Sequence, residues 1–454
     1  MQKAKSVAGQ NNNEALRVLQ TVSLYLTGNM EQDINDKDTY TNNTSGMQKA
    51  RSYITVKVFG KTITLATFYF PSGTLKVKGY HTMNENGVVT SSSTAIDVPL
   101  KGVKMHFLTW FYWGHTYTDE NGYYQASESY LLDPIHTIYF SGRTKNQQNS
   151  WDLDRVWLWG SCLWVQKHCL GEQSKDVYNA TIDVTSDAWD ACITNNAFYE
   201  YMTICDKEGL TRPPSHLQVA LRVNLSGSSS APLFQNHTNT FTTSVLAGFF
   251  TSTFITGGST APATVVYIAF LNSLPDILLS AGNIEEYQNY GYSRKSSLNE
   301  YYSTIWHELS HSSNLQRVIS EKGYWTASDF WSQMIGTEVG HSVASGHPYG
   351  AKGDTNWQQV ALCEGWAYYR GWQMARNYLN YTPNSSYESS FPYDYQDMFN
   401  ELFIKGCSLT NMEKCLTVKT LAEYKSLLTN IYSFDAVKVT NINVIVNKYY
   451  NKTY

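Results

Sequence analysis

Residues 297–322 read SLNEYYSTIWHELSHSSNLQRVISEK, and this stretch decides how the second half of the chain is organised. It contains neither glycine nor proline, so it predicts one long helix. Ser297 and Glu300 have the spacing of a capping box, in which the hydroxyl accepts a backbone N–H and the carboxylate reaches back. We therefore expect the helix to begin near Ser297 and to continue to Lys322.

Two histidines and a glutamate stand together in this helix, in the order His307, Glu308, x, x, His311. Residues four apart share one face of a helix, about one turn apart, so both imidazoles can bind one metal ion. Zinc accepts histidine nitrogens in tetrahedral sites, and Glu308 can reach a metal-bound water as general base. The alternative is a surface helix on which these side chains bind nothing.

The motif resembles that of the zincin metallopeptidases, and the resemblance covers roughly residues 205–380. In the metzincins a third histidine follows six residues after the second, but Arg317 stands at that position, so this pattern fails. In the gluzincins the third ligand is a glutamate on a later helix. The resemblance implies Zn²⁺ as cofactor, a gluzincin-like ligand set and zinc-dependent peptide-bond hydrolysis.

Glu364 is the first candidate for that third ligand. It lies in an apolar segment, residues 360–369, that predicts a helix continuing to Met374. An acidic residue in such surroundings needs a compensating partner, and a metal ion is one. Ala367 shares the face of Glu364, and its small side chain would let this helix approach the first one closely.

Other residues could replace Glu364 as ligand. Glu338 stands between two glycines, so we expect it on a loop, and it is the second candidate. His341, His347 and Glu321 are further alternatives. The distance from His311 to Glu364 exceeds that of compact gluzincins, which predicts an inserted loop or hairpin at residues 323–356 that shapes the substrate cleft. That insert holds Tyr324, Trp325, Trp331, His341, His347 and Tyr349.

Zincins usually add a tyrosine or histidine that donates to the oxyanion. The resemblance implies Tyr368, one turn beyond Glu364, or else His341 in this catalytic role beside Glu308.

The first part of the chain predicts strands. Residues 53–59 and 62–70 are rich in β-branched and aromatic types, and residues 116–124 contain the Asp and Asn-Gly signals of a hairpin turn. Together with residues 99–107, that segment resembles the carboxypeptidase regulatory-like module, a transthyretin-like β-sandwich without catalysis. An unrelated β-sandwich is the alternative.

The whole chain is therefore expected to be multidomain, with an N-terminal all-β sandwich followed by an α+β zincin-like catalytic domain. The expected parts are a leader or linker at 1–47 with a helix at 14–26, the sandwich at 48–147, and the metallopeptidase domain at 148–454. Within the last part the sequence predicts helices at 151–169, 188–205, 393–404 and 418–431, and strands at 217–225, 265–271 and 276–280.

Composition narrows the function further. The net charge of −4 and the lack of a Lys/Arg run exclude nucleic-acid binding. Charged residues make up 16% of the chain, while 34 Tyr and 13 Trp suit contact with sugars or extended peptides. We see no signal peptide and no apolar run fit to span a membrane. Cys192 with Cys205, and Cys407 with Cys415, are close enough in sequence to form disulfides, with free thiols as the alternative.

The expected function is a zinc endopeptidase acting on proteins or glycoproteins, secreted or on a bacterial cell surface or in the periplasm, with a lipid anchor outside this chain as a further option. A catalytically silent zincin that binds surface glycans or glycoproteins is the main alternative. An adhesive protein with a fortuitous motif, and a zinc hydrolase of non-peptide substrates, are the others.

Overall fold

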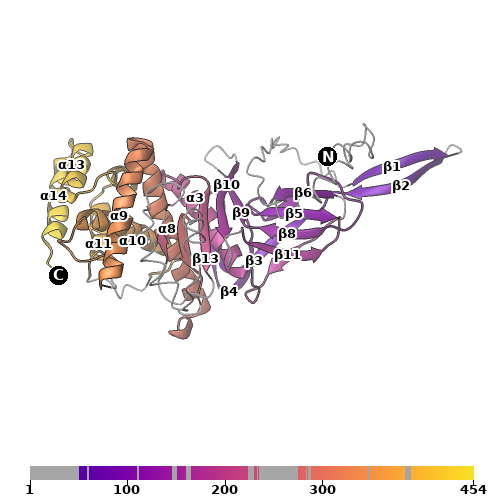
Figure 1. Cartoon of the computed structure of the whole chain (residues 1–454), viewed down its shortest axis with the longest axis horizontal. Helices are drawn as coiled ribbons and strands as arrows, with labels where there is room; N and C mark the ends of the chain where they lie inside the picture. The colour runs from indigo at the N-terminus through magenta and orange to yellow at the C-terminus, as the bar shows by residue number, and fades with distance from the viewer. Residues whose placement is uncertain are drawn as a thin grey trace, which may run out of the picture. The chain divides into compact units, whose positions relative to one another are not determined.

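The computed structural model describes most of the chain beyond residue 50. The described residues are 51–58, 61–109, 112–145, 151–159, 165–222, 230–232, 234, 275–282, 284, 288–345, 348–383 and 390–453. A sheet-rich N-terminal region is followed by a helical C-terminal region, so the chain is a multidomain α+β protein (Figure 1).

Contacts divide the chain into two compact units. Unit 1 comprises Met1–Lys76, Pro99–Tyr139 and Lys167–Ile182, and unit 2 comprises Val77–Val98, Phe140–Gln166 and Asp183–Tyr454. The two units interleave along the sequence, whereas the parts expected from the sequence are contiguous, with boundaries at 47 and 147. Those expected boundaries stay a prediction. The predicted helix at 14–26 lies outside the described residues.

Antiparallel sheets build unit 1. The predicted strands at 53–59 and 62–70 are confirmed as β1 (Arg51–Val58) and β2 (Lys61–Tyr69), which pair with each other. A four-stranded sheet has the order β11-β8-β5-β6, and its strands are Lys167–Glu172, Ile135–Tyr139, Lys104–Thr109 and Tyr112–Tyr117. Met105, Phe107 and Ile138 are fully buried because alternate residues of a strand point to the same face.

The predicted hairpin at 116–124 is wrong in its pairing, although its turn forms. Asp119 Oδ1 accepts the backbone N–H groups of Asn121 and Tyr123, each at 2.8 Å, which closes the turn. The flanking strands pair elsewhere, since β6 pairs with β5, while β7 (Tyr123–Gln125) pairs with β3 (Ser72–Met83). Strand β3 also lies between β12 (Ala180–Ile182) and β4 (Val89–Pro99).

Unit 2 contains a mixed five-stranded sheet in the order β14-β15-β13-β10-β9. Its strands are Ala231–Pro232, Ile277–Ser280, Leu217–Arg222, Trp151–Trp159 and Ser141–Lys145. Strand β13 pairs in parallel with β10 and β15, whereas β14 runs antiparallel to β15. The strands predicted at 217–225 and 276–280 are confirmed over their described residues, and the one at 265–271 lies outside them.

The helix predicted at 151–169 is wrong, because this segment forms the inner strand β10 and then β11. Val156 and Leu158 register with residues of β13 on one side, while Trp151 and Trp157 register with residues of β9 on the other. Hydrogen bonding to two neighbouring strands overrides a weak local preference for helix.

Eight helices also belong to the described part of unit 2 (Figure 1). They are α3 (Trp189–Glu208), α8 (Arg294–Lys322), α9 (Tyr324–Ser345), α10 (Trp357–Leu379), α11 (Asp394–Ile404), α12 (Leu409–Lys414), α13 (Leu421–Ile431) and α14 (Ala436–Asn451). The helices predicted at 188–205, 393–404 and 418–431 are thus confirmed. None of the described helices is long and apolar enough to cross a membrane.

Helix α8 begins one turn earlier than predicted. Ser293 is its N-cap and accepts the backbone N–H of Ser296 at 3.2 Å, so the capping box predicted at Ser297 is wrong. Ser297 lies inside the helix, where its hydroxyl donates to the carbonyl oxygen of Ser293 at 3.1 Å. The end at Lys322 is as predicted, and Gly323 follows with φ 83°.

Helix α9 occupies the segment that was expected to be an inserted loop or hairpin. It runs from Tyr324 to Ser345 and includes Glu338, so the loop expected at Glu338 is wrong as well. Gly336 and Gly340 do not end the helix, because a helix tolerates isolated glycines at a cost of about 1 kcal/mol each. Tertiary packing supplies the compensation: Ala327, Phe330, Trp331, Met334 and Ile335 are buried in one cluster with Leu315 and Val318 of α8.

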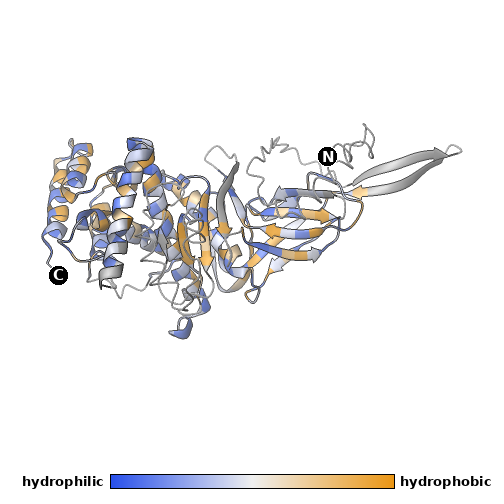
Figure 2. Cartoon of the chain, viewed as in Figure 1, coloured by the Kyte–Doolittle hydropathy of each residue, from blue (hydrophilic) through white to orange (hydrophobic). Residues whose placement is uncertain are grey.

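The C-terminal helices close over α10 through a shared apolar core. Its members include Trp366 and Tyr369 of α10, Phe399 of α11, Tyr424 of α13 and Ile442 of α14. Figure 2 shows hydrophobic residues mixed with hydrophilic ones along α13 and α14, as expected of helices with one buried face.

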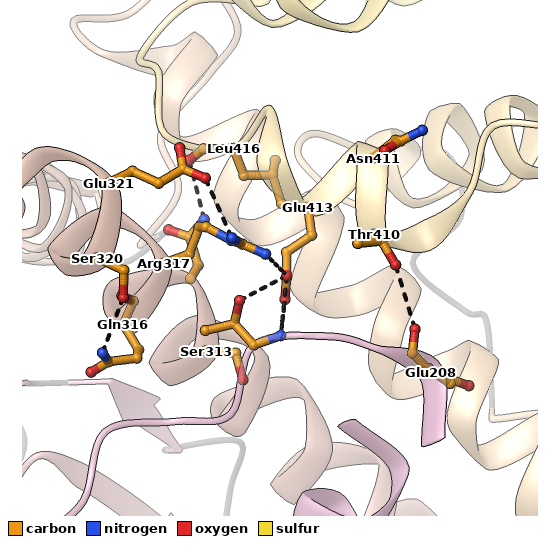
Figure 3. Close-up of polar contacts among 12 residues, drawn as sticks. Glu208, Ser313, Gln316, Arg317, Ser320, Glu321, Thr410, Asn411, Glu413 and Leu416 are labelled. Atoms are coloured by element: carbon orange, nitrogen blue, oxygen red, sulfur yellow. Dashed lines mark hydrogen bonds and ion pairs between the residues drawn. The ribbon is translucent and has the colours of Figure 1, made fainter. Parts of the chain in front are cut away.

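A buried carboxylate also joins these helices to α8. Glu413 of α12 is 1% exposed and accepts a hydrogen bond from Arg317 Nη2 at 2.8 Å (Figure 3). It also accepts one from Thr211 Oγ1 at 2.9 Å. Arg317 also lies 3.4 Å from Glu321 on its own helix. Arg317 stands where a metzincin would have its third histidine, and here it forms ion pairs with Glu413 and Glu321 instead.

The six described cysteines are free thiols, and Cys162 lies outside the described residues. Cys192 and Cys205 both lie in α3, about 20 Å apart at ~1.5 Å per residue, so they cannot pair and the free-thiol alternative holds for them. Cys407 and Cys415 are likewise unpaired and buried.

Candidate metal centre

Helices α8 and α10 approach each other closely at a glycine. A Cβ atom at Gly371 would lie 2.7 Å from the carbonyl oxygen of Ser303 and 3.3 Å from His307 Cβ. Ala367, the small residue expected at this contact, is fully buried. Gly371, one helical turn further along α10, is a second small residue at this contact.

This approach brings three side chains together. The ligand atoms of His307, His311 and Glu364 all lie within 4.8 Å of one another. His311 Nε2 is 3.1 Å from His307 Nε2 and 3.1 Å from Glu364 Oε1, and His307 Nε2 is 3.5 Å from Glu364 Oε2. All three residues are buried, with exposed fractions of 8%, 1% and 2%.

The donor set of this cluster fits a metal ion. Two imidazole nitrogens and one carboxylate converge, and neutral imidazole and ionised carboxylate would point lone pairs at one place. A cation there would offset the cost of burying the carboxylate. His307, His311 and Glu364 could therefore hold a metal ion, and they are the group that was expected from the sequence.

The pKa shifts at this cluster favour the ligand forms. Burial lowers the pKa of His307 below its ordinary value of 6.5, although the bond to Glu364 opposes this, so the imidazole stays neutral. Burial acts to raise the pKa of Glu364, but the positive charge of His311 and the hydrogen bonds from His307 and His311 outweigh it and hold the pKa well below its usual range. A metal ion binds these deprotonated forms.

Glu308 differs from Glu364 in its environment. It is 4% exposed, and its Oε2 atom has no hydrogen-bond partner among the described residues. Burial, with a further contribution from the charge of Glu364, raises its pKa well above 4.5. A carboxylate with a raised pKa is a stronger proton acceptor, which suits a general base.

Glu338, the other candidate ligand, lies beside the cluster rather than in it. Its side chain makes a hydrogen bond with that of Glu364, and burial with the charge of Glu364 raises its pKa well above 4.5. The three ligand atoms that converge belong to His307, His311 and Glu364.

Tyr368 lies against the cluster of candidate ligands, with its ring centroid 4.2 Å from that of His307. The ring of His341, the alternative oxyanion donor, packs against Gly350, and its Nδ1 is 3.9 Å from Asp354 Oδ2. The catalytic roles of both residues stay predictions. Glu321 pairs with Arg317 as described above, and His347 lies outside the described residues.

Two aromatic residues that were expected to shape the cleft do lie at the cluster. Trp331 of α9 packs edge-on to His311 at 5.7 Å, and the Tyr349 hydroxyl is 2.9 Å from that of Tyr368. Tyr393 also contacts Tyr368, with ring centroids 4.6 Å apart. Sequence reasoning missed Tyr393, because it stands 29 positions after Glu364 in a segment with no motif.

No family model matches this chain, and no significant match was found among the curated proteins or the solved structures.

Proposed function

We propose that this chain is a metal-dependent hydrolase, with zinc as the metal and peptide bonds as the target. The observation that carries the proposal is the buried cluster of His307, His311 and Glu364 with Glu308 beside it. Two nitrogens and one oxygen are the ligand set typical of catalytic zinc, which keeps a further position open.

A zinc ion held there would polarise a carbonyl group and lower the pKa of a water molecule. Glu308 would accept a proton from the attacking water and pass it to the leaving amine. Its raised pKa suits both transfers. Tyr368, against His307, is the proposed donor to the substrate oxygen, with His341 as the alternative.

A peptide substrate is supported by the chemistry of the cluster, since two histidines, a carboxylate and an adjacent general base suit hydrolysis of a peptide bond. The 34 Tyr and 13 Trp of the chain suit contact with extended peptides or sugars. Proteins and glycoproteins are thus the proposed substrate class, with a zinc hydrolase of other substrates as an alternative.

The finer fold and the location are proposals too. The antiparallel sheets of unit 1 support a transthyretin-like sandwich, and the mixed sheet with α8 and α10 in unit 2 supports a zincin-like domain. The low charge and high tyrosine content support a secreted or surface location.

The test combines metal analysis with proteolysis. We expect about one zinc per chain by mass spectrometry of the purified protein, and cleavage of fluorescein-labelled casein that a chelator abolishes. Zinc without cleavage of any protein or glycoprotein substrate would favour the silent, glycan-binding alternative. Absence of zinc after reconstitution would rule out the proposed metal centre.

A further inference from the structure

Two tyrosine hydroxyls meet beside the metal cluster. Tyr368 is on α10, and Tyr349 is in the segment between α9 and α10. Their hydroxyl oxygens are 2.9 Å apart, and their rings meet edge to face with centroids 6.5 Å apart. Tyr393 packs against both rings and makes a side-chain hydrogen bond with Tyr368.

One of these three tyrosines contacts the most exposed of the three ligands. The His307 side chain is 10% exposed, against 1% for His311 and 2% for Glu364. Tyr368 packs on His307, which is therefore the ligand nearest to solvent. Tyr368 therefore lies beside the most exposed of the three ligands.

Both hydroxyls remain protonated at neutral pH and act as hydrogen-bond donors. Burial raises the pKa of Tyr349 and of Tyr368 well above 10, and the nearby charge of Glu364 raises both further. The charge of Glu364 acts on each of them, which agrees with their position at the cluster.

The position of Tyr368 between two other hydroxyls limits where its hydrogen can point. A hydroxyl oxygen has two acceptor lone pairs and one hydrogen. When Tyr349 donates to Tyr368 Oη, which agrees with the lowering effect of this bond on the Tyr368 pKa, the Tyr368 hydrogen points away from Tyr349 and can bond to a substrate oxygen in place of Tyr393. Accepting the bond from Tyr349 also polarises the O–H group of Tyr368 and makes it a stronger donor.

We propose that Tyr349 is a positioning residue of the metal centre: its hydroxyl donates to Tyr368 Oη and so directs the Tyr368 hydrogen toward a substrate oxygen beside His307. The inference rests on the proposed hydrolase function and adds to it a residue outside the ligand motif. Tyr349 itself need not touch the substrate.

Steady-state kinetics of the metal-loaded protein on a quenched fluorescent peptide pool test the proposal. We expect Tyr349→Phe to lower kcat by about 10- to 100-fold with KM and metal content unchanged. Tyr368→Phe should lower kcat further, by about 100- to 1000-fold, because it removes a group that donates directly to the substrate oxygen. The double variant should be no slower than Tyr368→Phe, because the two hydroxyls act as a unit. Tyr450→Phe, at a half-exposed tyrosine of α14, is the matched control.

Thermal unfolding of the metal-free variants provides a readout independent of activity. If the hydroxyls bond to each other, the double variant should lower Tm less than the sum of the two single shifts. Additive Tm shifts, or a Tyr349→Phe variant with the wild-type kcat, would overturn the positioning role while the hydrolase function stands. A wild-type protein that binds metal and cleaves no peptide would overturn the hydrolase function and this role with it.

Discussion

His311 Nε2 lies 3.1 Å from Glu364 Oε1, and this contact joins two helices that are separated in sequence by the whole of α9. The histidine comes from the motif on α8, and the glutamate comes from an apolar face of α10. Each side chain is nearly fully buried, so neither would be stable there without the other or a shared cation.

The first prediction concerns the third ligand. Glu364→Gln should weaken zinc affinity by more than about 100-fold, beyond the 10- to 100-fold typical of residues that only orient ligands. Glu338→Gln is the matched variant, and it should keep one zinc per chain. Competition with a chromophoric chelator measures both. The reverse ranking would transfer the ligand role to Glu338.

The second prediction concerns Glu308. Glu308→Gln should keep the zinc and lower kcat by about 10²- to 10⁴-fold, because loss of a general base removes the proton transfer alone. Zinc content and casein cleavage measured on one preparation check this. Substantial cleavage by the variant would mean that another group accepts the proton.

The third prediction concerns pH. The pKa of His307 lies below 6.5 and that of Glu364 lies below its usual range, so these two ligands become protonated at lower pH than ordinary side chains do. Zinc should therefore remain bound at pH 6, where an ordinary histidine is largely protonated. Dialysis against zinc-free buffers of stepped pH measures this, and complete loss of zinc above pH 6.5 would contradict it.

The same shifts affect stability without metal. A lowered histidine pKa means that the unfolded state binds more protons, so the His307 contribution falls as the pH drops below 6.5. The lowered Glu364 pKa acts in the same direction at more acidic pH, since its contribution is lost as the pH falls through its folded pKa. The metal-free protein should lose Tm on acidification through this window.

The fourth prediction concerns Gly371. In Gly371→Ala the new Cβ would meet the backbone oxygen of Ser303 at 2.7 Å, which forces α8 and α10 apart. We expect a loss of about 1–3 kcal/mol in the free energy of unfolding, as overpacking costs, together with weaker zinc binding. Gly336→Ala in α9 is the control, since nothing lies within 4 Å of its added Cβ, and it should gain about 0.5–1 kcal/mol. Equal effects of the two changes would argue against the close helix contact.

The fifth prediction concerns the link drawn in Figure 3. Glu413→Ala removes a buried partner of Arg317 and Thr211, so it should cost about 3–5 kcal/mol of unfolding free energy. Glu321→Ala removes the more exposed partner of the same arginine and should cost about 0–1 kcal/mol. Chemical denaturation measures both, and similar losses would mean that burial does not decide the strength of this link.

Local patterns in the sequence determined the helix that carries the metal motif and the face on which His307 and His311 stand. Both depend on a period of 3.6 residues and on the absence of glycine and proline, which no distant contact has to supply. The same reasoning predicted α3, α11 and α13 and the strands β1, β2, β13 and β15.

Tertiary structure decided what depends on partners distant in sequence. The segment 151–159 is a strand because β9 and β13 bond to its two sides, and α9 is a helix because a buried cluster compensates for its glycines. Glu364 rather than Glu338 completes the converging group because Gly371 lets α10 approach α8. Such contacts form where helices and strands pack against each other in space. The sequence of a single segment does not specify those positions.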